Sequence, residues 1–326
     1  MRAVLCREIR EPHALEWGEA PAPALPGPKS VRIAMRAAAL NFADTLIVTG
    51  KYQDKPALPF VPGIEGAGVV LEVGAEVAHV KAGDRVMASM NTGAFAEEAV
   101  AEAANVFAIP DAMDFATAAS FQVVYGTSHL ALARRGQLKA GETLLVLGAA
   151  GGVGLTAVEL GRRMGARVIA AARGAEKCAL ARAYGADETI DLAHEDLKTR
   201  VRELTRGRGA DVVYDPVGGD AFDVAVRLLA LEGRLLVVGF AAGRIPQAPA
   251  NILLVKNAAV IGVFWGAYRT AAPAVVRAAF EEMLGWYAAG QLKPHISLRV
   301  PLARFEEGFA AMLARRSTGK IVFDIA

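Results

Sequence analysis

A cluster of glycines follows a short apolar run near the middle of the chain. The run, Thr143–Leu147, is aliphatic or β-branched, which is typical of a strand buried on both faces of a parallel sheet. Gly148 follows it at once, Gly151, Gly152 and Gly154 come shortly after, and a helical pattern begins there. A strand, a glycine-rich turn and a helix together form a site where backbone N–H groups bind the pyrophosphate of a dinucleotide. Ala149 takes the first place of the G-x-G-x-x-G pattern, so the motif is degenerate.

The residues after the second predicted strand indicate which dinucleotide is bound. A site for NAD carries Asp or Glu roughly 20 residues beyond the glycines, where the carboxylate binds the ribose hydroxyls. That place holds Ala172, followed by Arg173 and, four residues on, Lys177. A carboxylate would repel a 2′-phosphate, whereas a guanidinium binds one through two hydrogen bonds. We therefore predict NADPH as the cofactor, with solvated surface charges as the alternative interpretation of Arg173 and Lys177.

Composition limits the class of protein. The 326 residues allow two domains, and 54% hydrophobic residues with 33 glycines favour an α/β fold rather than a disordered chain. The net charge of +2 is spread along the chain, so we expect no nucleic-acid or membrane partner. No apolar stretch reaches the ~20 residues of a membrane span, and the first residues are strand-like, which favours a cytoplasmic location. Cys6 and Cys178 have no second ligand nearby in the sequence, which excludes a Cys-rich zinc site.

The order of predicted elements gives the domain organisation. Short strands are expected at 31–35, 68–73, 85–88, 95–100 and 105–109, followed by a helix over 114–135 with Asp114 as its N-cap. Strands at 143–148, 167–172, 188–190, 210–215, 233–239 and 258–263 then alternate with helices at 152–164, 175–184, 197–205 and 219–229. The tail is predicted to form helices at 272–289 and 302–315 and a strand at 320–325.

This order predicts an α/β protein in which one domain is inserted into another. The inserted domain, 123–264, is a doubly wound six-stranded parallel (Rossmann) sheet that binds NADPH. The surrounding domain, 1–122 and 265–326, is mainly antiparallel β and supplies the substrate side. We expect the active site in the cleft between the two domains.

Several segments resemble the medium-chain dehydrogenase/reductase superfamily over essentially the whole chain. They are PGIEGAGVV at 62–70, GDRV at 83–86, AAGGVG at 149–154 and STGK at 317–320. NILLVKN at 251–257, followed by WG at 265–266, resembles the quinone-oxidoreductase-like-protein-2 type of its zinc-free NADPH:quinone oxidoreductase branch. The resemblance implies a GroES-like catalytic domain, a Rossmann domain and a homodimer that pairs the edge strands at 258–263.

The departures from the zinc-dependent alcohol dehydrogenases concern the metal. Where those enzymes carry a zinc-binding cysteine this chain has Asn41, and where they carry the zinc-binding histidine it has Ile64. Neither an amide nor an alkyl group replaces those ligands, so we expect no metal and treat Glu65 as a remnant. Hydride transfer then needs an acceptor that is already electrophilic, a quinone or an α,β-unsaturated carbonyl.

The resemblance also implies roles for single residues. The expected catalytic residues are Tyr52, as the donor to the substrate oxygen, and Asn41, which is placed beside the nicotinamide ribose. Leu46 stands where relatives often have a second tyrosine. Tyr52 could also line the pocket without taking part in the chemistry. The expected cofactor contacts are Asn41, Thr127, Ala150, Gly151, Gly152, Val153, Arg173, Lys177, Phe240, Ala241, Phe264, Trp265 and Lys320.

Three functions fit these observations. The first is an NADPH-dependent quinone reductase, and the second is an NADPH-dependent reductase of enones or 2-enoyl thioesters. The third is a non-catalytic NADPH-binding redox sensor, which would bind the cofactor without turning over an acceptor.

Overall fold

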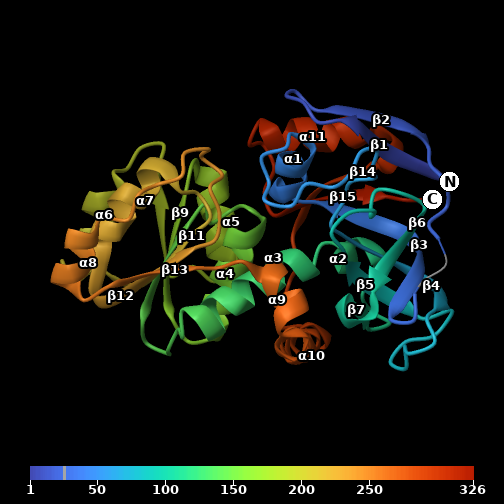
Figure 1. The fold of residues 1–326 in the computed structure, drawn as a ribbon. Coiled ribbons are helices and arrows are strands. Elements are labelled where there is room, and N and C mark those ends of the chain that lie inside the picture. Colours follow the sequence, from blue (N-terminus) through green and yellow to red (C-terminus); the bar gives the residue numbers. More distant parts are fainter. Residues whose placement is uncertain (25–26) are drawn as a thin grey trace. The chain divides into compact units, whose positions relative to one another are not determined.

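The chain folds into two compact units. In the computed structural model, which describes residues 1–24 and 27–326, the first unit is Met1–Val123 with Arg269–Ala326 and the second is Val124–Tyr268 (Figure 1). The second unit is thus inserted into the first along the sequence. The sequence placed the divisions at 122/123 and 264/265.

A six-stranded parallel sheet forms the centre of the second unit, in the order β10-β9-β8-β11-β12-β13. The direction of winding reverses between β8 and β11, which makes the sheet doubly wound and confirms the predicted Rossmann topology. The strands are β8 (Thr143–Leu147), β9 (Arg167–Ala172), β10 (Glu188–Asp191), β11 (Ala210–Asp215), β12 (Leu229–Val237) and β13 (Ala259–Gly262).

Helices cover both faces of this sheet. α4 (Gly152–Arg163) and α5 (Ala175–Ala183) lie on one face, and α6 (Leu197–Leu204), α7 (Gly219–Ala225) and α8 (Ala250–Lys256) lie on the other (Figure 1). All five residues of β8 are buried, as the apolar run predicted. The predicted helix at 219–229 ends as α7 at Ala225 and continues as one 3-10 turn.

The first unit is built around the long strand β3 (Ser30–Leu40). Its sheet has the order β14-β15-β3-β4-β5-β7 with β6 also paired to β3, and every pairing is antiparallel except β14 with β15. The mainly antiparallel prediction is confirmed. The remaining strands are β4 (Glu65–Val73), β5 (Arg85–Ser89), β6 (Glu98–Glu102), β7 (Val106–Ala108), β14 (Ile296–Pro301), β15 (Lys320–Asp324) and the pair β1 (Arg2–Glu8) and β2 (Ala14–Glu19).

Four short helices and two longer ones complete the structure. They are α1 (Phe42–Val48), α2 (Phe115–Ala119), α3 (Gln122–His129), α9 (Trp265–Ala271), α10 (Pro273–Ala288) and α11 (Phe305–Leu313). The sequence missed α1, α8, α9 and β14, all of which are short. No helix among the described residues is long and apolar enough to cross a membrane.

The predicted continuous helix at 114–135 is wrong. Asp114 does cap its start, because its Oδ1 accepts the N–H of Thr117 at 2.7 Å. The helix breaks after Ala119, where the Ser120 hydroxyl donates to the carbonyl of Thr117 and the Glu65 carboxylate accepts the N–H of Val123. These side chains compete with the backbone hydrogen bonds of a continuous helix. The chain then restarts as α3 and ends in a π-helical segment, Leu130–Arg135.

The strand predicted at 95–100 begins three residues later in the structure than predicted. Residues 95 to 97 bond to β1 instead, since Val4 N–H donates to Phe95 O and Glu97 N–H donates to Arg2 O. The side chain of Phe95 packs edge-on against Phe323, with ring centroids 5.0 Å apart. This aromatic contact joins the start of β6 to the core of the first unit.

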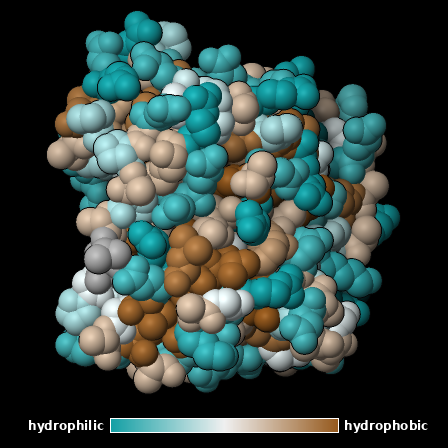
Figure 2. All heavy atoms as spheres, turned by 90° about the vertical axis from the view of Figure 1, so that its right-hand side faces the viewer, coloured by the Kyte–Doolittle hydropathy of each residue, from teal (hydrophilic) through white to brown (hydrophobic). Residues whose placement is uncertain are grey.

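The surface of the first unit mixes polar and apolar side chains. Figure 2 faces the side on which both chain termini lie, and it shows hydrophobic atoms near the middle of that face among hydrophilic ones. Leu58 and Leu71 are among the exposed apolar side chains of this unit. Exposed apolar atoms of this kind are ordinary on folded proteins.

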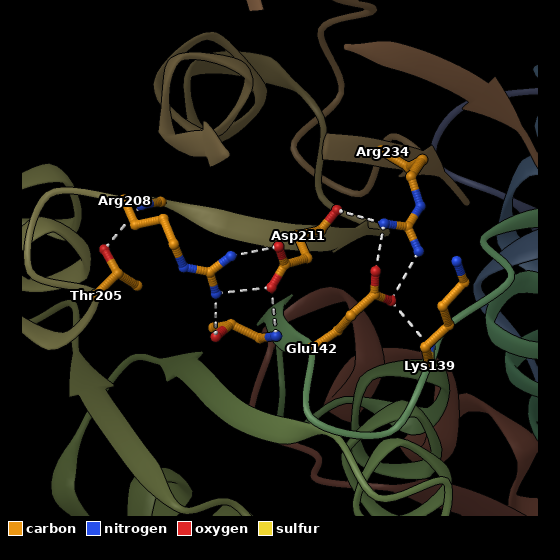
Figure 3. A network of polar contacts seen from close by, with 8 residues as sticks. Lys139, Glu142, Thr205, Arg208, Asp211 and Arg234 are labelled. Atoms are coloured by element: carbon orange, nitrogen blue, oxygen red, sulfur yellow. Dashed lines mark hydrogen bonds and ion pairs between the residues drawn. The ribbon is translucent and has the colours of Figure 1, made fainter. Parts of the chain in front are cut away.

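An ion-pair network lies at the amino-terminal end of the parallel sheet (Figure 3). Arg234 holds both carboxylate oxygens of Glu142, at 2.9 and 2.8 Å, and Arg208 holds both oxygens of Asp211, at 2.6 and 2.8 Å. The N–H of Lys139 also donates to Glu142. Burial alone would raise the pKa of Glu142 and of Asp211, but the guanidinium groups hold both pKa values below the usual ones.

Candidate active site

The glycine-rich turn lies at the carboxyl-terminal end of β8. A Cβ on Gly154 would lie 2.2 Å from the carbonyl oxygen of Gly148, so this position must be glycine for α4 to pack on the turn. Gly151 caps α4 and is exposed, and a Cβ there would meet nothing closer than Gly148 O at 3.4 Å. The packing of the protein therefore does not explain the glycine at 151. In dinucleotide-binding sites, a glycine at this place lets the backbone approach the pyrophosphate closely.

A buried network of three hydroxyl groups supports this turn from behind. The Ser128 hydroxyl donates to the carbonyl of Val153 at 2.9 Å and lies 2.8 Å from Thr156 Oγ1 and 2.9 Å from the Tyr214 hydroxyl. Burial raises the pKa of Tyr214. These contacts fix the first turn of α4. In the sequence, these contacts are indicated only by hydroxyl residues that lie within otherwise apolar helices and strands.

Arg173 lies directly after β9. At this place a dinucleotide-binding site distinguishes a ribose that carries a 2′-phosphate from one that does not. The side chain of Arg173 is exposed, and Lys177 is half-buried on α5. The structure adds Asp191, from the end of β10, whose Oδ1 accepts the N–H groups of Ala193 and Gly174. These bonds, with a smaller contribution from Arg173, lower the pKa of Asp191. An acid therefore lies near Arg173 and holds the turn after it, which the sequence analysis missed because the acid comes from a different strand.

Other predicted cofactor contacts follow the carboxyl ends of neighbouring parallel strands. Phe240 and Phe264 are 37% and 43% exposed, whereas Trp265 is buried as the first residue of α9. Ala241 is half-buried, and its N–H donates to Pro216 O at 3.1 Å. Thr127, on α3, is nearly buried. The parallel strands bring the residues that follow β8, β9, β12 and β13 to one edge of the sheet.

Asp215 ends β11 next to the glycine turn and is buried. Its Oδ1 accepts the N–H groups of Val217 and Gly218 at 2.8 and 2.9 Å, and burial raises its pKa. Its Oδ2 has no hydrogen-bond partner within the described part of the chain. A buried oxygen without a donor at this edge is a polar group to which a ligand hydroxyl could donate.

In the first unit, three residues named in the sequence analysis form one buried cluster. Two of them were expected to contact the cofactor, and the third was treated as a remnant of a metal site. The Lys320 ammonium donates to Leu40 O at 2.9 Å, to Asn41 Oδ1 at 2.7 Å and to Glu65 Oε1 at 2.8 Å. The Asn41 amide nitrogen donates to Glu65 Oε1 at 2.9 Å and to Ala39 O at 3.3 Å. Lys320, Asn41 and Glu65 are 5%, 6% and 0% exposed.

The protons of this cluster are all directed at protein atoms. An ammonium has three N–H groups and a side-chain amide has two, and those of Lys320 and Asn41 match the five contacts above. The two side chains predicted to face a cofactor thus bind each other and Glu65. The other oxygen of Glu65 accepts the N–H of Val123 at 2.9 Å.

Asp44 adds a second carboxyl to this cluster. Its Oδ2 accepts the backbone N–H of Asn41 at 2.8 Å at the start of α1, while no described residue hydrogen-bonds its Oδ1. Burial raises the pKa of Asp44 to about 7, although Asn41 N–H and Lys320 oppose the shift. One ammonium and two carboxyls therefore share a buried space.

Tyr52 is half-buried against the core of the first unit. Burial first and then Asp54 raise the pKa of its phenol, while Arg269 acts in the opposite direction. A guanidinium nitrogen of Arg269 donates to Asn91 Oδ1 at 2.7 Å. The phenol therefore carries its proton at neutral pH, as an ordinary tyrosine does, and can donate a hydrogen bond.

The sequence of the chain matches two protein-family models. Residues 27–111 match the alcohol dehydrogenase GroES-like domain, and residues 152–287 match the zinc-binding dehydrogenase model. Despite that name, no group of three or more His, Cys, Asp or Glu side chains in residues 1–24 and 27–326 could hold a metal ion.

Full-length relatives and solved structures agree with these models. A quinone oxidoreductase-like protein 2 homolog from Nematostella vectensis is 41% identical, over 99% of this chain and 88% of its own length. The Pseudomonas syringae quinone oxidoreductase structure superposes with a TM-score of 0.92 at 34% identity, covering 99% of both chains. The Escherichia coli quinone oxidoreductase complexed with NADPH has a TM-score of 0.92 at 29% identity, covering 99% of this chain and all of the other.

The doubly wound sheet, the glycine turn and these full-length matches lead to the same assignment. The chain belongs to the medium-chain dehydrogenase/reductase superfamily of oxidoreductases, in the group of the quinone oxidoreductase-like proteins.

Proposed function

We propose that the protein is a zinc-independent reductase that transfers a hydride from NADPH to a quinone. The observation that carries this proposal is the exposed Gly151 at the N-terminus of α4, with Arg173 rather than an acid after the next strand. The related quinone oxidoreductases, one of them solved with NADPH, support it. In this proposal the inserted unit, 123–264 by the sequence boundaries, binds NADPH, and the remainder provides the acceptor side.

The second unit has residues for each part of the dinucleotide. The N-terminus of α4, from Ala150 to Val153, binds the pyrophosphate through backbone N–H groups and the partial positive charge of the helix. Arg173 and Lys177 bind the 2′-phosphate. The apolar side chains after β12 and β13, with Thr127, surround the nicotinamide, which supplies the hydride when it is bound. The contacts in this last group are Phe240, Ala241, Phe264 and Trp265.

The first unit stabilises charge on the acceptor. Hydride addition to a quinone or an enone leaves negative charge on oxygen, and a hydrogen-bond donor placed there lowers the barrier. Tyr52 is the donor, because it is a half-buried phenol that carries a proton at neutral pH. The Asn41 amide and Lys320 are buried with Glu65, so their role toward the cofactor is to shape its binding surface rather than to offer free protons.

The side chains at the positions where the zinc-dependent enzymes have their metal ligands support a reaction without zinc. Asn41 and Ile64 stand where the zinc-dependent enzymes have ligands, and the nearby Glu65 carboxylate is bound by the Lys320 ammonium. A carboxylate that is hydrogen-bonded by Lys, Asn and a backbone N–H has little capacity left for a metal ion. The cation needed to balance Glu65 is part of the chain.

We also propose a homodimer in the cytoplasm. β13 is the edge of the six-stranded sheet, and pairing with the same strand of a second copy would extend the sheet. The adjacent helix α8 exposes Leu254 and Val255, at 77% and 67%, which such a partner would cover. The buried free thiols Cys6 and Cys178 are compatible with a reducing compartment. Light scattering of the purified protein measures the oligomeric state, and a monomer at micromolar concentration would contradict the dimer.

The acceptor is tested by NADPH oxidation with a small quinone and a short 2-enoyl-CoA, side by side. We expect kcat/KM for the quinone to exceed that for the thioester. Preference for the thioester would instead make the protein an enoyl reductase, since Tyr52 can serve either oxygen. Tight NADPH binding with neither acceptor reduced would favour the redox sensor.

The cofactor assignment has its own test in Arg173→Ala. We expect KM for NADPH to rise roughly tenfold, for a loss of about 1.5–3 kcal/mol from a charge-assisted hydrogen bond, while KM for NADH stays unchanged. Arg182→Ala, at an exposed position of α5, is a matched control because Arg182 bonds to Thr189. An unaltered preference for NADPH over NADH in Arg173→Ala would show that the phosphate site lies elsewhere.

A further inference from the structure

Glu65 is a fully buried carboxylate in a strand that otherwise consists mainly of small and apolar residues. Moving a carboxylate out of water costs several kcal/mol unless it is paired and hydrogen-bonded. Three donors compensate Glu65, and they come from distant parts of the chain: Asn41, Val123 and Lys320. An apolar group of the same shape would stabilise such a site about as well, so stability alone does not explain the charges.

What the ion pair does is to give the Asn41 amide one orientation. The amide oxygen faces the Lys320 ammonium, and the amide nitrogen faces the Glu65 carboxylate. Rotating the amide by half a turn would bring its N–H groups to the ammonium and its oxygen to the carboxylate, and both contacts would be repulsive. The charges therefore decide between two orientations that have nearly the same shape.

The orientation of Asn41 matters because Asn41 begins α1. Its backbone N–H is held by Asp44 in the first turn, and the helix ends at Val48. The chain then turns sharply, with Lys51 N–H donating to Leu46 O at 2.8 Å, and Tyr52 follows. The cluster thus fixes the start of α1, and Tyr52 lies beyond the turn that follows the end of this helix.

We propose that Glu65 and Lys320 are positioning residues of the reductase reaction, whose buried ion pair orients the Asn41 amide and, through α1, places Tyr52. A charge pair within the chain thereby fixes this part of the acceptor side without a metal ion. This inference rests on the proposed function, in which Tyr52 serves the acceptor.

The test compares Glu65→Gln, Lys320→Met and the double variant. Either single change leaves one buried charge unpaired, and we expect the melting temperature to fall by about 10 °C. The double variant lacks both charges of this pair and should regain most of that loss. Its kcat with the acceptor should stay about tenfold or more below that of the wild type, because neither replacement side chain carries the charge that distinguishes the two amide orientations.

Two further measurements separate positioning from simple stabilisation. The Kd for NADPH, from fluorescence titration, should change less than about threefold in the double variant, so that the loss appears in kcat. The matched control is Glu142→Gln with Arg234→Met, which removes an ion pair of the second unit and should change stability without changing kcat. Return of kcat to the wild-type value together with the melting temperature would overturn the proposal.

A readout independent of turnover keeps the proposal testable if no acceptor is found. In protein labelled with ¹⁵N-asparagine, the Asn41 side-chain N–H signals, assigned from Asn41→Ser, should exchange slowly with water. In the double variant they should exchange about tenfold faster or more. Equal exchange rates would contradict the positioning role, whereas an inactive wild type with slow exchange would contradict only the proposed function.

Discussion

The two ion-pair clusters, one in each unit, are balanced in opposite ways. At the amino-terminal end of the parallel sheet each carboxylate has its own guanidinium, and both pairs are bidentate (Figure 3). In the first unit two carboxyls, Asp44 and Glu65, share the single ammonium of Lys320. The first arrangement lowers the pKa values of its acids, whereas in the second the pKa of Asp44 is raised to about 7.

This difference separates a cluster that serves stability from one that serves the site. The Arg234–Glu142 pair keeps about a fifth of each side chain exposed, so water can compensate for small displacements. The side chains of Lys320 and Glu65 are 5% and 1% exposed, so bulk water does not reach them. Under-compensated buried charge is costly, and folds retain it where a group must be held in one place or must change its protonation.

Replacing the glutamate of each cluster by leucine should give the largest contrast between the clusters, measured as the loss of stability. Glu65→Leu would leave the Lys320 ammonium buried and would remove acceptors from Asn41 and Val123. We expect a loss of about 3–5 kcal/mol or more, which is a large part of the stability of a domain. Denaturant unfolding combined with hydrogen exchange should place this loss in Met1–Val123 and Arg269–Ala326. A loss below about 1 kcal/mol would mean that the cluster is far less coupled than its hydrogen bonds indicate.

Glu142→Leu should have a smaller effect of the same kind. Arg234 keeps hydrogen bonds to the carbonyls of Gly136, Asp211 and Gln137, and water can reach its guanidinium. We expect a loss of about 1–3 kcal/mol, confined to the second unit. The same unfolding experiment measures it, and steady-state kinetics should show unchanged KM values. If Glu142→Leu cost as much as Glu65→Leu, the contrast between the clusters would not hold.

The smallest predicted effect is on the pH dependence of stability, which should have opposite signs for the two clusters. Asp211 and Glu142 have pKa values below their ordinary 3.8 and 4.5, so their contribution to stability is present above those values and is lost as the pH falls through the lower folded pKa values. Asp44 has a folded pKa of about 7, so its contribution is present below the ordinary value of 3.8 and is lost as the pH rises to about 7. The slope for Asp44 is at most about 1.4 kcal/mol per pH unit.

Hydrogen exchange of each unit between about pH 2 and pH 8 measures this contrast. The first unit should lose stability as the pH rises, and Asp44→Asn should flatten that dependence, because an amide does not titrate. Asp211→Asn should alter only the acid side of the second unit. An Asp44→Asn variant with the wild-type slope would show that another group titrates in the first unit.

The sequence alone was sufficient to predict the strands of the parallel sheet and the residues of the glycine turn. Buried parallel strands are continuous apolar runs, and turn glycines are needed at fixed offsets, so β8, β9 and β11 were predicted to within a residue. The position of Arg173 directly after β9 was predicted because it is counted from the glycines. Short elements such as α1 and β14 lack a full period of the apolar pattern, and the sequence missed them.

The tertiary structure alone decided what the polar residues do. Glu65 and Lys320 are 255 positions apart in the sequence, and no local pattern links them. Asp191 reaches the turn after Arg173 from a neighbouring strand, and Ser128 meets Tyr214 only after the sheet has formed. Backbone periodicity is local, so a sequence shows which residues are buried. Charge compensation and hydrogen bonding depend on which residues meet across the fold, and only the folded chain determines that.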